Sequence, residues 1–376
     1  MNLPRLNVDP DGLLEYSVVF TDRSLNHMSA LFIRTMQDLL DVLRDTYGAD
    51  TVAVVPGGGT YAMEAVARQL ATGQRCVVGR NGFFSYRWTQ IFEAGGITDQ
   101  VTVCQARPES EDPHSGWVPA PADEMVETIR REQPALVFLT HVETASGILL
   151  PDDYVRTVAD AAHEVGALLV LDCIASGALW VNMRDLKVDV LVSAPQKGWS
   201  GTPCAGYVML GDAARQRVQE TTSTSFAMNL ATWLGISEGY AEGRAGYHAT
   251  MPTDGLAQNA ALMLEASERG LDTLREEQLK LGRRVRELLS AKGFASVAAE
   301  GYQAPSVVVV HADDPAISTG AAFKQVGLQV AAGVPLQCGE PSSWATVRLG
   351  LFGLDKLGDV DGTVARLEKA LTELGR

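Results

Sequence analysis

Short runs of almost uninterrupted apolar residues recur through the first 210 residues, and stretches with helical periodicity separate them. The runs are 51–55, 76–79, 135–141, 167–172, 188–194 and 205–210. Continuous apolar runs of this length indicate strands that are buried on both faces. We therefore expect an α/β fold with a mainly parallel sheet covered by helices. Ligands in such sheets bind beyond the carboxyl ends of the strands.

The sequence changes character after about residue 255. The later segments are a long helical stretch (256–292), a strand-like run (306–312), a glycine-containing stretch (326–350) and a helix from about residue 359. This mixture predicts a smaller α+β domain at the C-terminus. The expected division is an N-terminal arm (1–25), a large domain (26–258) and a small C-terminal domain (259–376).

Composition narrows the possible partners. The 376 residues carry a formal net charge of −15, which repels phosphodiester backbones, so we expect no nucleic-acid partner. No apolar run approaches the roughly 18–20 residues that cross a bilayer, and we expect no membrane partner. The N-terminus shows no secretory signal, and the five cysteines are scattered without a CxxC pair. Both features favour a reducing, cytoplasmic location. The six histidines show no metal-ligand spacing, so no metal site is expected.

A glycine turn follows the first strand, in "PGGGTYAMEA". Gly58 and Gly59 stand between a strand and a predicted helix that starts at Thr60. Exposed amides and the helix dipole there favour an anion such as phosphate. The turn also matches a dinucleotide fingerprint, but the next strand ends in "VVGRNG" without the acidic residue that holds a ribose. An ordinary tight turn remains the alternative.

Two further strands end in ionisable residues. Asp172 closes the apolar run in "LLVLDCIASG", and Lys197 follows the run that ends in "SAPQKGWSG". Alone, Asp172 could cap a helix or pair with an arginine, and Lys197 could be a solvated surface residue. Together with the glycine turn they match one cofactor, pyridoxal 5′-phosphate. Its phosphate, protonated ring nitrogen and aldehyde need an anion site, a carboxylate and a lysine amine, respectively.

At these residues the sequence resembles the class V aminotransferases of the fold-type I pyridoxal-phosphate enzymes. The resemblance is closest to the alanine–glyoxylate, serine–pyruvate and 2-aminoethylphosphonate–pyruvate aminotransferases. It runs from about residue 50 to the C-terminus and is carried, in family order, by "GGGTYAMEA", "THVETASG", "LLVLDCIASG", "SAPQKGWSGTPCAG", "YHATMPT" and "VRLGLFG". It implies a mainly parallel seven-stranded sheet and a homodimer with shared active sites.

The resemblance also implies roles for individual residues. The implied cofactor-binding set is Gly58, Gly59, Thr60, Phe84, Thr144, Asp172, Ile174, Gln196, Lys197, Tyr247 and Thr250. Phe84 and Ile174 would contact the two faces of the pyridine ring. Tyr247 and Thr250 would reach the phosphate in the other subunit. Asp172 and Lys197 would be the catalytic pair, with Lys197 carrying the cofactor as a Schiff base.

Arg348 and an unusual N-terminal segment bear on the substrate. Arg348, in "ATVRLGLFG", could be a salt-bridged arginine, but a guanidinium also suits a carboxylate, and the resemblance favours substrate binding. The Pro-Gly-Pro loop usual near the family's site is missing here. Asn26 and His27 are expected to edge the substrate pocket instead, from this subunit or its partner.

The expected reaction is transamination from a small amino acid, alanine- or serine-like or 2-aminoethylphosphonate-like, to a 2-oxo acid such as pyruvate or glyoxylate. The alternative is a lyase that uses the same cofactor for β-elimination or desulfurase-like cleavage. Cys338, in "PLQCGEPSSW", lies where related desulfurases keep a nucleophilic cysteine. A small buried or loop cysteine is the commoner role for such a residue. A nicotinamide-binding or non-enzymatic role is the third hypothesis.

Overall fold

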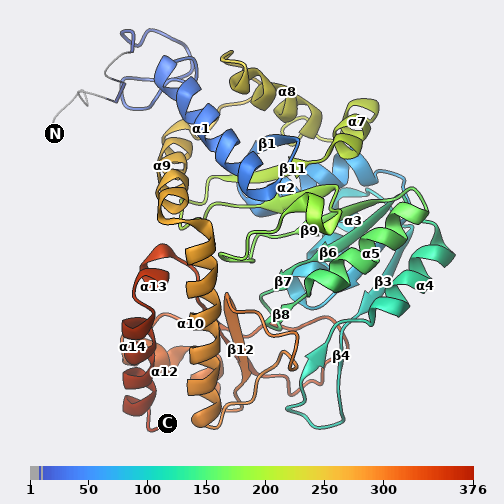
Figure 1. Cartoon of the computed structure of the whole chain (residues 1–376), viewed down its shortest axis with the longest axis vertical. Coiled ribbons are helices and arrows are strands. Elements are labelled where there is room, and N and C mark those ends of the chain that lie inside the picture. The colour runs from blue at the N-terminus through green and yellow to red at the C-terminus, as the bar shows by residue number, and fades with distance from the viewer. Residues whose placement is uncertain (1–7, 10–11) are drawn as a thin grey trace.

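The computed structural model describes residues 8–9 and 12–376, so part of the predicted N-terminal arm (1–25) lies outside the described residues. Its central feature is a seven-stranded sheet with the order β1-β11-β10-β9-β6-β2-β3 (Figure 1). The strands are β1 (Thr51–Pro56), β2 (Cys76–Arg80), β3 (Val101–Gln105), β6 (Leu136–Thr140), β9 (Leu168–Asp172), β10 (Val190–Ser193) and β11 (Ala205–Leu210). Each predicted apolar run is a strand of this sheet, and β3 is added at its edge.

The sheet is mainly parallel, as predicted. The strand β11 pairs antiparallel with both of its neighbours, β1 and β10, and the other pairs are parallel. The carboxyl ends of β1, β2, β6, β9 and β10 therefore meet at one edge. Because each parallel crossover is right-handed, α2 and α3 cover one face and α4 and α5 the other, as Figure 1 shows.

The helices of this part of the chain are α1 (Ala30–Tyr47), α2 (Gly59–Val66), α3 (Phe83–Gly95), α4 (Ala122–Glu132), α5 (Asp152–Glu164), α6 (Met183–Leu186), α7 (Asp212–Glu220) and α8 (Leu230–Ala241). Between α2 and β2 the chain widens into one π-helical turn, η1 (Ala67–Ala71). Two small ribbons, β4 (Arg107–Pro108) with β5 (Trp117–Val118) and β7 (Val142–Glu143) with β8 (Ile148–Leu149), lie outside the main sheet.

Local sequence explains why α5 forms where it does. Pro151 precedes the helix, and two aspartates in the first turn favour the positive end of the helix dipole. Val155, Val158 and Ala162 lie on one face and are buried, as the periodicity predicts. The apolar spacing of Val155, Val158, Ala162 and Val165 predicts a helix near 152–165; the observed helix ends one residue earlier, and Val165 is its half-buried C-cap.

The C-terminal part contains α9 (Thr253–Arg269), α10 (Leu271–Ala291), β12 (Val307–His311), α11 (Pro315–Ser318), α12 (Ala321–Gln325), β13 (Ala331–Ala332), β14 (Thr346–Gly350), α13 (Leu354–Gly358) and α14 (Val360–Glu373). The predicted helical stretch 256–292 is not one helix, because Gly270 has a φ of 94° and breaks it into α9 and α10. The strands form a separate antiparallel sheet, β12-β14-β13. The division near residue 258 stays a prediction.

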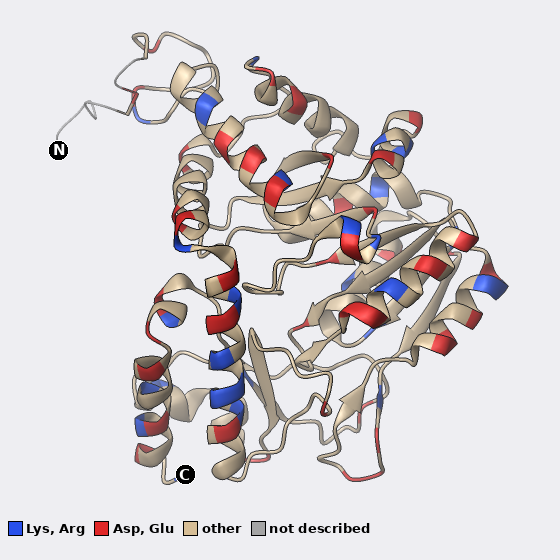
Figure 2. Cartoon of the chain, in the orientation of Figure 1, with Lys and Arg blue, Asp and Glu red and all other residues tan. Residues whose placement is uncertain are grey.

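Charged side chains are dispersed over the outer helices. Lys and Arg alternate with Asp and Glu along α4, α5, α10 and α14 (Figure 2). In the described part of the chain no helix is both long and apolar enough to span a bilayer.

Candidate active site

A cavity of ≈ 510 Å³ opens at the carboxyl edge of the main sheet, where a parallel sheet of this kind binds its ligands. It is lined from the large sheet by Gly58, Gly59, Thr60, Tyr61, Met63, Phe84, Arg87, Val142, Thr144, Asp172, Ile174, Ala175, Gln196 and Lys197, and from the C-terminal part by Val307, Ala331, Arg348, Gly350 and Phe352. The structure thus gathers the glycine turn, the strand-end carboxylate and the strand-end lysine into one space.

The glycine turn brings the start of α2 to the cavity wall. Gly58 is the N-cap of α2 and Gly59 its first residue, so their amides lie at the helix N-terminus. A Cβ on Gly59 would lie 2.4 Å from Cδ1 of Ile174, whereas a Cβ on Gly58 would meet nothing within 4 Å. Gly59 therefore allows Ile174 to pack closely against the helix start. The free N–H groups of this turn can hold an anion.

Asp172 ends β9 and is buried. One of its oxygens, Oδ1, accepts a hydrogen bond from the Ile174 amide at 2.9 Å. The pKa of this carboxyl is raised to about 7: burial is the main cause and the negative charge of Glu143 adds to it, while the Ile174 hydrogen bond and the charge of Arg87 oppose the shift. Ionising a buried carboxyl costs free energy, which a neighbouring cation offsets. Asp172 is therefore suited to a protonated ring nitrogen.

Lys197 follows β10 in a tight turn. Gly198 is required there, because a Cβ at that position would lie 2.1 Å from the carbonyl oxygen of Gly177. The Lys197 ammonium lies 5.1 Å from the centre of the Phe352 ring. Burial lowers the pKa of Lys197, and the nearby charge of Arg348 lowers it further. Both effects favour the neutral, nucleophilic amine.

Arg348 reaches the same cavity from β14. Its Nε donates a hydrogen bond to the Ala332 carbonyl at 2.8 Å, and its guanidinium carbon lies 5.7 Å from the centre of the Phe84 ring. Among the described residues, no carboxylate forms an ion pair with this guanidinium. The remaining N–H groups of Arg348 are thus available to an anionic ligand.

Sequence reasoning missed Arg87, which also lines the cavity. Its Nη1 donates to the Thr60 hydroxyl oxygen at 3.0 Å, and its guanidinium carbon lies 5.0 Å from the centre of the Phe84 ring. Arg87 follows Phe84 by three residues on α3, and side chains at this spacing share a helix face. That spacing, applied to the predicted stacking residue Phe84, was the available signal.

Glu143 is a second residue that the sequence did not reveal. It is fully buried, and its carboxylate accepts hydrogen bonds from the amides of Phe84 at 3.2 Å and Ser85 at 2.8 Å. These are orphan donors in the first turn of α3, whose N-cap, Gly82, has no side chain. Glu143 therefore fixes the start of α3 and, with it, the position of Phe84. No sequence spacing signals this contact, which spans 59 residues.

Thr144 and Gln196 both line the cavity, as predicted. The amide oxygen of the Gln196 side chain, Oε1, is buried and has no hydrogen-bond partner among the described residues. Buried polar groups are normally hydrogen-bonded. A polar ligand in the cavity would supply the missing partner.

Four predicted residues lie outside this cavity in the single chain. Tyr247 is 56% exposed, and its hydroxyl lies 3.4 Å from that of Thr250. The His27 ring packs 5.5 Å from the Tyr247 ring, and Asn26 donates to Glu15 at 2.8 Å. The chain therefore brings the four predicted residues together as a separate cluster. Their contribution to a partner's site stays a prediction.

Cys338 is also outside the residues that line the cavity. Its thiol lies 3.5 Å from the Arg80 carbonyl oxygen, and burial raises its pKa to about 12. A thiol with such a pKa is protonated at neutral pH and is a poor nucleophile.

The family Aminotransferase class-V matches residues 13–351, which is most of the chain. The chain belongs to the class-V aminotransferases. A 2-aminoethylphosphonate–pyruvate transaminase of Burkholderia ambifaria is 30% identical over 362 residues, covering 94% of this chain and 90% of that protein. An alanine–glyoxylate aminotransferase of Callithrix jacchus is 25% identical over 386 residues, and the match covers 98% of this chain and 85% of that protein.

The fold agrees with this assignment. A crystal structure of an alanine–glyoxylate aminotransferase from Nostoc superposes with a TM-score of 0.76 at 22% identity, covering 92% of this chain and 89% of that one. This class-V aminotransferase therefore has the α/β fold of the fold-type I pyridoxal-phosphate enzymes. It is a pyridoxal-phosphate-dependent enzyme.

The cavity fits that cofactor on its own evidence. It offers an anion cradle at the start of α2, a buried carboxyl on Asp172 that forms no ion pair among the described residues, and the amide oxygen of Gln196, which has no hydrogen-bond partner there. Lys197 is the only lysine among the residues that line it. These groups match the phosphate, the ring nitrogen and the aldehyde of pyridoxal phosphate.

Proposed function

We propose that this aminotransferase moves an amino group from a small amino acid, alanine- or serine-like or 2-aminoethylphosphonate-like, to a 2-oxo acid such as pyruvate or glyoxylate, with Lys197 as the amine that binds the cofactor aldehyde. The observation that carries the proposal is the meeting of Lys197, Asp172 and Arg348 in one cavity. The names of the relatives support the two substrate classes.

The bound cofactor supplies an electron sink for the bond that breaks at the substrate Cα. In the proposed site, Asp172 would keep a proton on the ring nitrogen and so maintain that sink. Phe84 and Ile174 would contact the ring, and Thr144 would be a hydrogen-bonding neighbour for its polar groups. The amides of Gly58 and Gly59, with the Thr60 hydroxyl, hold the phosphate, and the Gln196 amide is a further polar contact.

Lys197 has two tasks in the proposed reaction. Its amine would hold the cofactor aldehyde in the resting enzyme. When free, the same amine would be the base that takes and holds the proton of the substrate Cα. Because burial and the charge of Arg348 lower the pKa of Lys197, the amine can accept that proton near neutral pH.

Arg348 binds the substrate carboxylate in this proposal. Its guanidinium is anchored through Nε to the Ala332 carbonyl, which leaves the terminal nitrogens for a bidentate contact. Phe84 and Phe352 line the cavity beside Arg348 and Lys197, respectively. The names of the relatives support a small amino acid as donor.

We also propose a homodimer with shared sites. Leu13, Leu14, Tyr16 and Val18 are each at least 87% exposed and lie on the same segment as Asn26 and His27. An apolar run of this kind on a surface marks an interaction site. A second copy is the proposed occupant, since Tyr247 and Thr250 then reach its phosphate cradle. The cytoplasmic location favoured by the five unpaired cysteines stays a prediction.

A lyase remains the second candidate because it would use the same cofactor and lysine. The structure gives Cys338 no place in the cavity lining and a thiol of high pKa, so a desulfurase-like role has no support here. A Cys338→Ser variant with unchanged turnover, and no release of sulfide, ammonia or pyruvate without a 2-oxo acid, would separate the two reactions.

The decisive experiment is a panel of amino donors and 2-oxo acid acceptors. Each donor is added to the purified holoenzyme alone, and the visible absorbance of the lysine-bound cofactor is followed. A donor that discharges its amino group bleaches this absorbance, and the matching acceptor restores it. Ping-pong kinetics should follow. A protein whose absorbance no donor changes would refute the proposed transamination.

A further inference from the structure

Ser200 has a backbone conformation that its residue type rarely adopts. Its φ is +60°, in the left-handed region that favours glycine and costs other residues free energy. Two of the other non-glycine residues with positive φ, Gln133 and Lys187, end helices, where this conformation is common. Ser200 ends no helix. Something in its surroundings must therefore hold it there.

The strained residue belongs to the turn that carries Lys197. The Ser200 amide donates to the Lys197 carbonyl at 3.0 Å, and the next amide, of Gly201, donates to the Pro195 carbonyl at 2.8 Å. On the far side of the turn, the Asn259 side chain of α9 accepts from the Thr202 amide at 2.7 Å. These bonds fix the backbone around Lys197, and the Ser200 side chain points away from the turn toward the C-terminal part of the chain.

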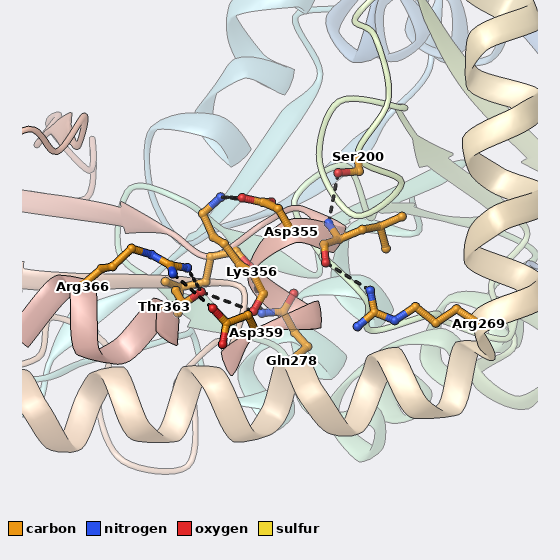
Figure 3. Close-up of polar contacts among 10 residues, drawn as sticks. Ser200, Arg269, Gln278, Asp355, Lys356, Asp359, Thr363 and Arg366 are labelled. Atoms are coloured by element: carbon orange, nitrogen blue, oxygen red, sulfur yellow. Dashed lines mark hydrogen bonds and ion pairs between the residues drawn. The ribbon is translucent and has the colours of Figure 1, made fainter. Parts of the chain in front are cut away.

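The Ser200 hydroxyl reaches the C-terminal part of the chain. Its Oγ accepts a hydrogen bond from the Leu354 amide at 3.1 Å, across 154 residues (Figure 3). Leu354 is the first residue of α13, whose N-cap, Gly353, has no side chain. The orphan donor of this helix is therefore satisfied from the Lys197 turn and not from its own segment.

Leu354 is held on its other side as well. Its carbonyl accepts from Nη1 of Arg269 at 3.1 Å (Figure 3). Nη2 of Arg269 pairs with Glu277 at 2.8 Å. Arg269 is the last residue of α9, just before the break at Gly270. The peptide of Leu354 is thus clamped between the Lys197 turn and the junction of α9 and α10.

The clamped residue ends a short segment, 348–354, that supplies the C-terminal wall of the active site. Arg348 begins this segment, and the Phe352 ring lies 5.1 Å from the Lys197 ammonium. In the proposed reaction, Lys197 and Arg348 contact the same substrate, although about 150 residues separate them in the chain. Apart from the cavity itself, the Ser200–Leu354 bond is the direct polar link between them that the structure shows.

We infer that Ser200 is a positioning residue of the reaction: its hydroxyl bond to the Leu354 amide holds segment 348–354, and with it Arg348 and Phe352, in register with the Lys197 turn. The inference rests on the proposed roles of Lys197 and Arg348. The left-handed backbone of Ser200 is explained by the same bond, because this conformation aims the hydroxyl at Leu354.

Three variants at one position separate the hydroxyl from the backbone. Ser200→Gly removes the acceptor but adopts a positive φ freely, so the turn keeps its shape. Ser200→Ala removes the acceptor and keeps the backbone cost. Ser200→Asn tolerates the left-handed conformation and offers a side-chain oxygen as a replacement acceptor. A purely structural role for the turn predicts that the glycine variant works as well as the wild type.

The first readout needs no substrate: it is the pH midpoint at which the visible spectrum of the Lys197-bound cofactor titrates in the holoenzyme. The charged side chains that line the cavity with Lys197 are Asp172, Arg87 and Arg348. Arg348 alone sits on the clamped segment, and its positive charge opposes protonation at Lys197. Releasing segment 348–354 should weaken this effect. The midpoint is expected to move upward in Ser200→Gly and Ser200→Ala and to return toward the wild-type value in Ser200→Asn.

The second readout is the response to L-alanine, measured as the concentration that half-converts the cofactor spectrum. Loss of one hydrogen bond that aligns Arg348 should raise this concentration roughly tenfold in the glycine variant, while cofactor binding is kept. The asparagine variant should recover part of the loss. If the wild-type protein binds the cofactor but responds to no amino donor, the proposed function is refuted. The pH midpoint of the cofactor spectrum, which needs no substrate, then still tests the role of Ser200.

Asp359 provides a matched control in the same bundle. Its side chain accepts from the Gly362 amide at 2.9 Å and so caps α14, and it pairs with Arg366 at 3.1 Å (Figure 3). It does not contact the Lys197 turn. Asp359→Ala should lower the melting temperature and leave the spectral midpoint unchanged. A wild-type midpoint and a wild-type alanine response in both Ser200→Gly and Ser200→Ala would overturn the inference, as would the same midpoint shift in Asp359→Ala.

Discussion

Asp172 is the last residue of β9, Lys197 follows the neighbouring parallel strand β10, and both residues line the same cavity. The register of these strands pairs Asp172 with Val192, so the carboxylate lies at the level where β10 ends and the lysine turn begins. The pair thus places a negative and a nucleophilic group at one edge of the sheet. In the proposed site, Asp172 would meet the ring nitrogen of the cofactor and Lys197 its aldehyde.

The pH dependence of the apo protein should reveal Asp172. Its folded pKa of about 7 lies above the ordinary value of 3.8, so between these values the folded state holds a proton that the unfolded state has released. Stability must then fall as pH rises through this window, by about 4 kcal/mol in total. Asp172→Asn removes this loss and can still accept from the Ile174 amide.

Urea unfolding of the cofactor-free protein tests this expectation at pH 4, 6 and 8. The variant should gain stability relative to the wild type as pH rises, and cofactor should then stabilise the wild type more than the variant. Parallel pH profiles for the two proteins would show that Asp172 is ionised without cost in the folded state.

Lys197→Ala should abolish the visible absorbance that reports the lysine-bound cofactor. Turnover should fall at least roughly 10⁴-fold, since both the amine that binds the cofactor and the proton carrier are lost. Absorbance spectra of the dialysed protein and a coupled assay measure the two effects. Lys187→Ala is the control, because Lys187 pairs with Asp160 on the surface. Normal turnover of the Lys197 variant would move the chemistry to another residue.

Arg348→Ala should raise KM for amino and 2-oxo acids that carry a carboxylate. The lost charge-assisted contact amounts to about 2–4 kcal/mol, or roughly 30- to 800-fold in kcat/KM. Arg348→Lys keeps the charge but lacks the bidentate geometry, so its kcat/KM should lie between those of the wild type and Arg348→Ala. Arg130→Ala, which breaks an exposed pair with Glu164, is the control for arginine removal. An unchanged KM would place the carboxylate elsewhere.

The limits of sequence reasoning are visible in these same residues. Asp172 and Lys197 could be predicted because each follows a long apolar run, and the end of a parallel strand fixes where its next residue lies. Glycine at 270 indicates a break, but the apolar periodicity continues across it. That periodicity therefore predicts one helix where the chain forms α9 and α10.

Arg87 and Glu143 could not be found from runs of apolar residues. The three-residue spacing from Phe84 could have placed Arg87 on the cavity side of α3, but its bond to the Thr60 hydroxyl depends on how α2 and α3 pack on one face of the sheet. Glu143 lies at the end of β7 and caps α3 across 59 residues, and no local pattern encodes that contact. Tertiary partners of this kind need coordinates.

Arg87 should contribute to cofactor affinity. By donating to the Thr60 oxygen it occupies the acceptor side of this hydroxyl and leaves its proton free for the phosphate, and its charge lies beside the anion cradle. Arg87→Ala should weaken cofactor binding roughly ten- to a hundredfold. Equilibrium titration of the apo protein measures this affinity. Arg68→Ala, which breaks the pair with Glu64 farther along α2, is the control. Equal cofactor affinity in the wild type and Arg87→Ala would assign Arg87 to substrate binding or to packing.

Shared active sites can be tested by mixing two inactive chains. Lys197→Ala lacks the cofactor amine, and a Tyr247→Phe, Thr250→Val double variant lacks the hydroxyls expected to reach the partner's phosphate. If the cluster of Tyr247 and Thr250 serves the neighbouring subunit, the hybrid dimer contains one site in which both defects meet and one site with neither.

Refolding an equimolar mixture should therefore restore activity. Random pairing makes half of the dimers hybrids, and each hybrid has one intact site, so about a quarter of the wild-type activity per chain is expected. The two parents refolded separately and then combined for the assay are the control. Activity that stays at the parental level in the refolded mixture, with hybrid dimers shown by differential tagging, would place Tyr247 and Thr250 in the site of their own chain or outside any site.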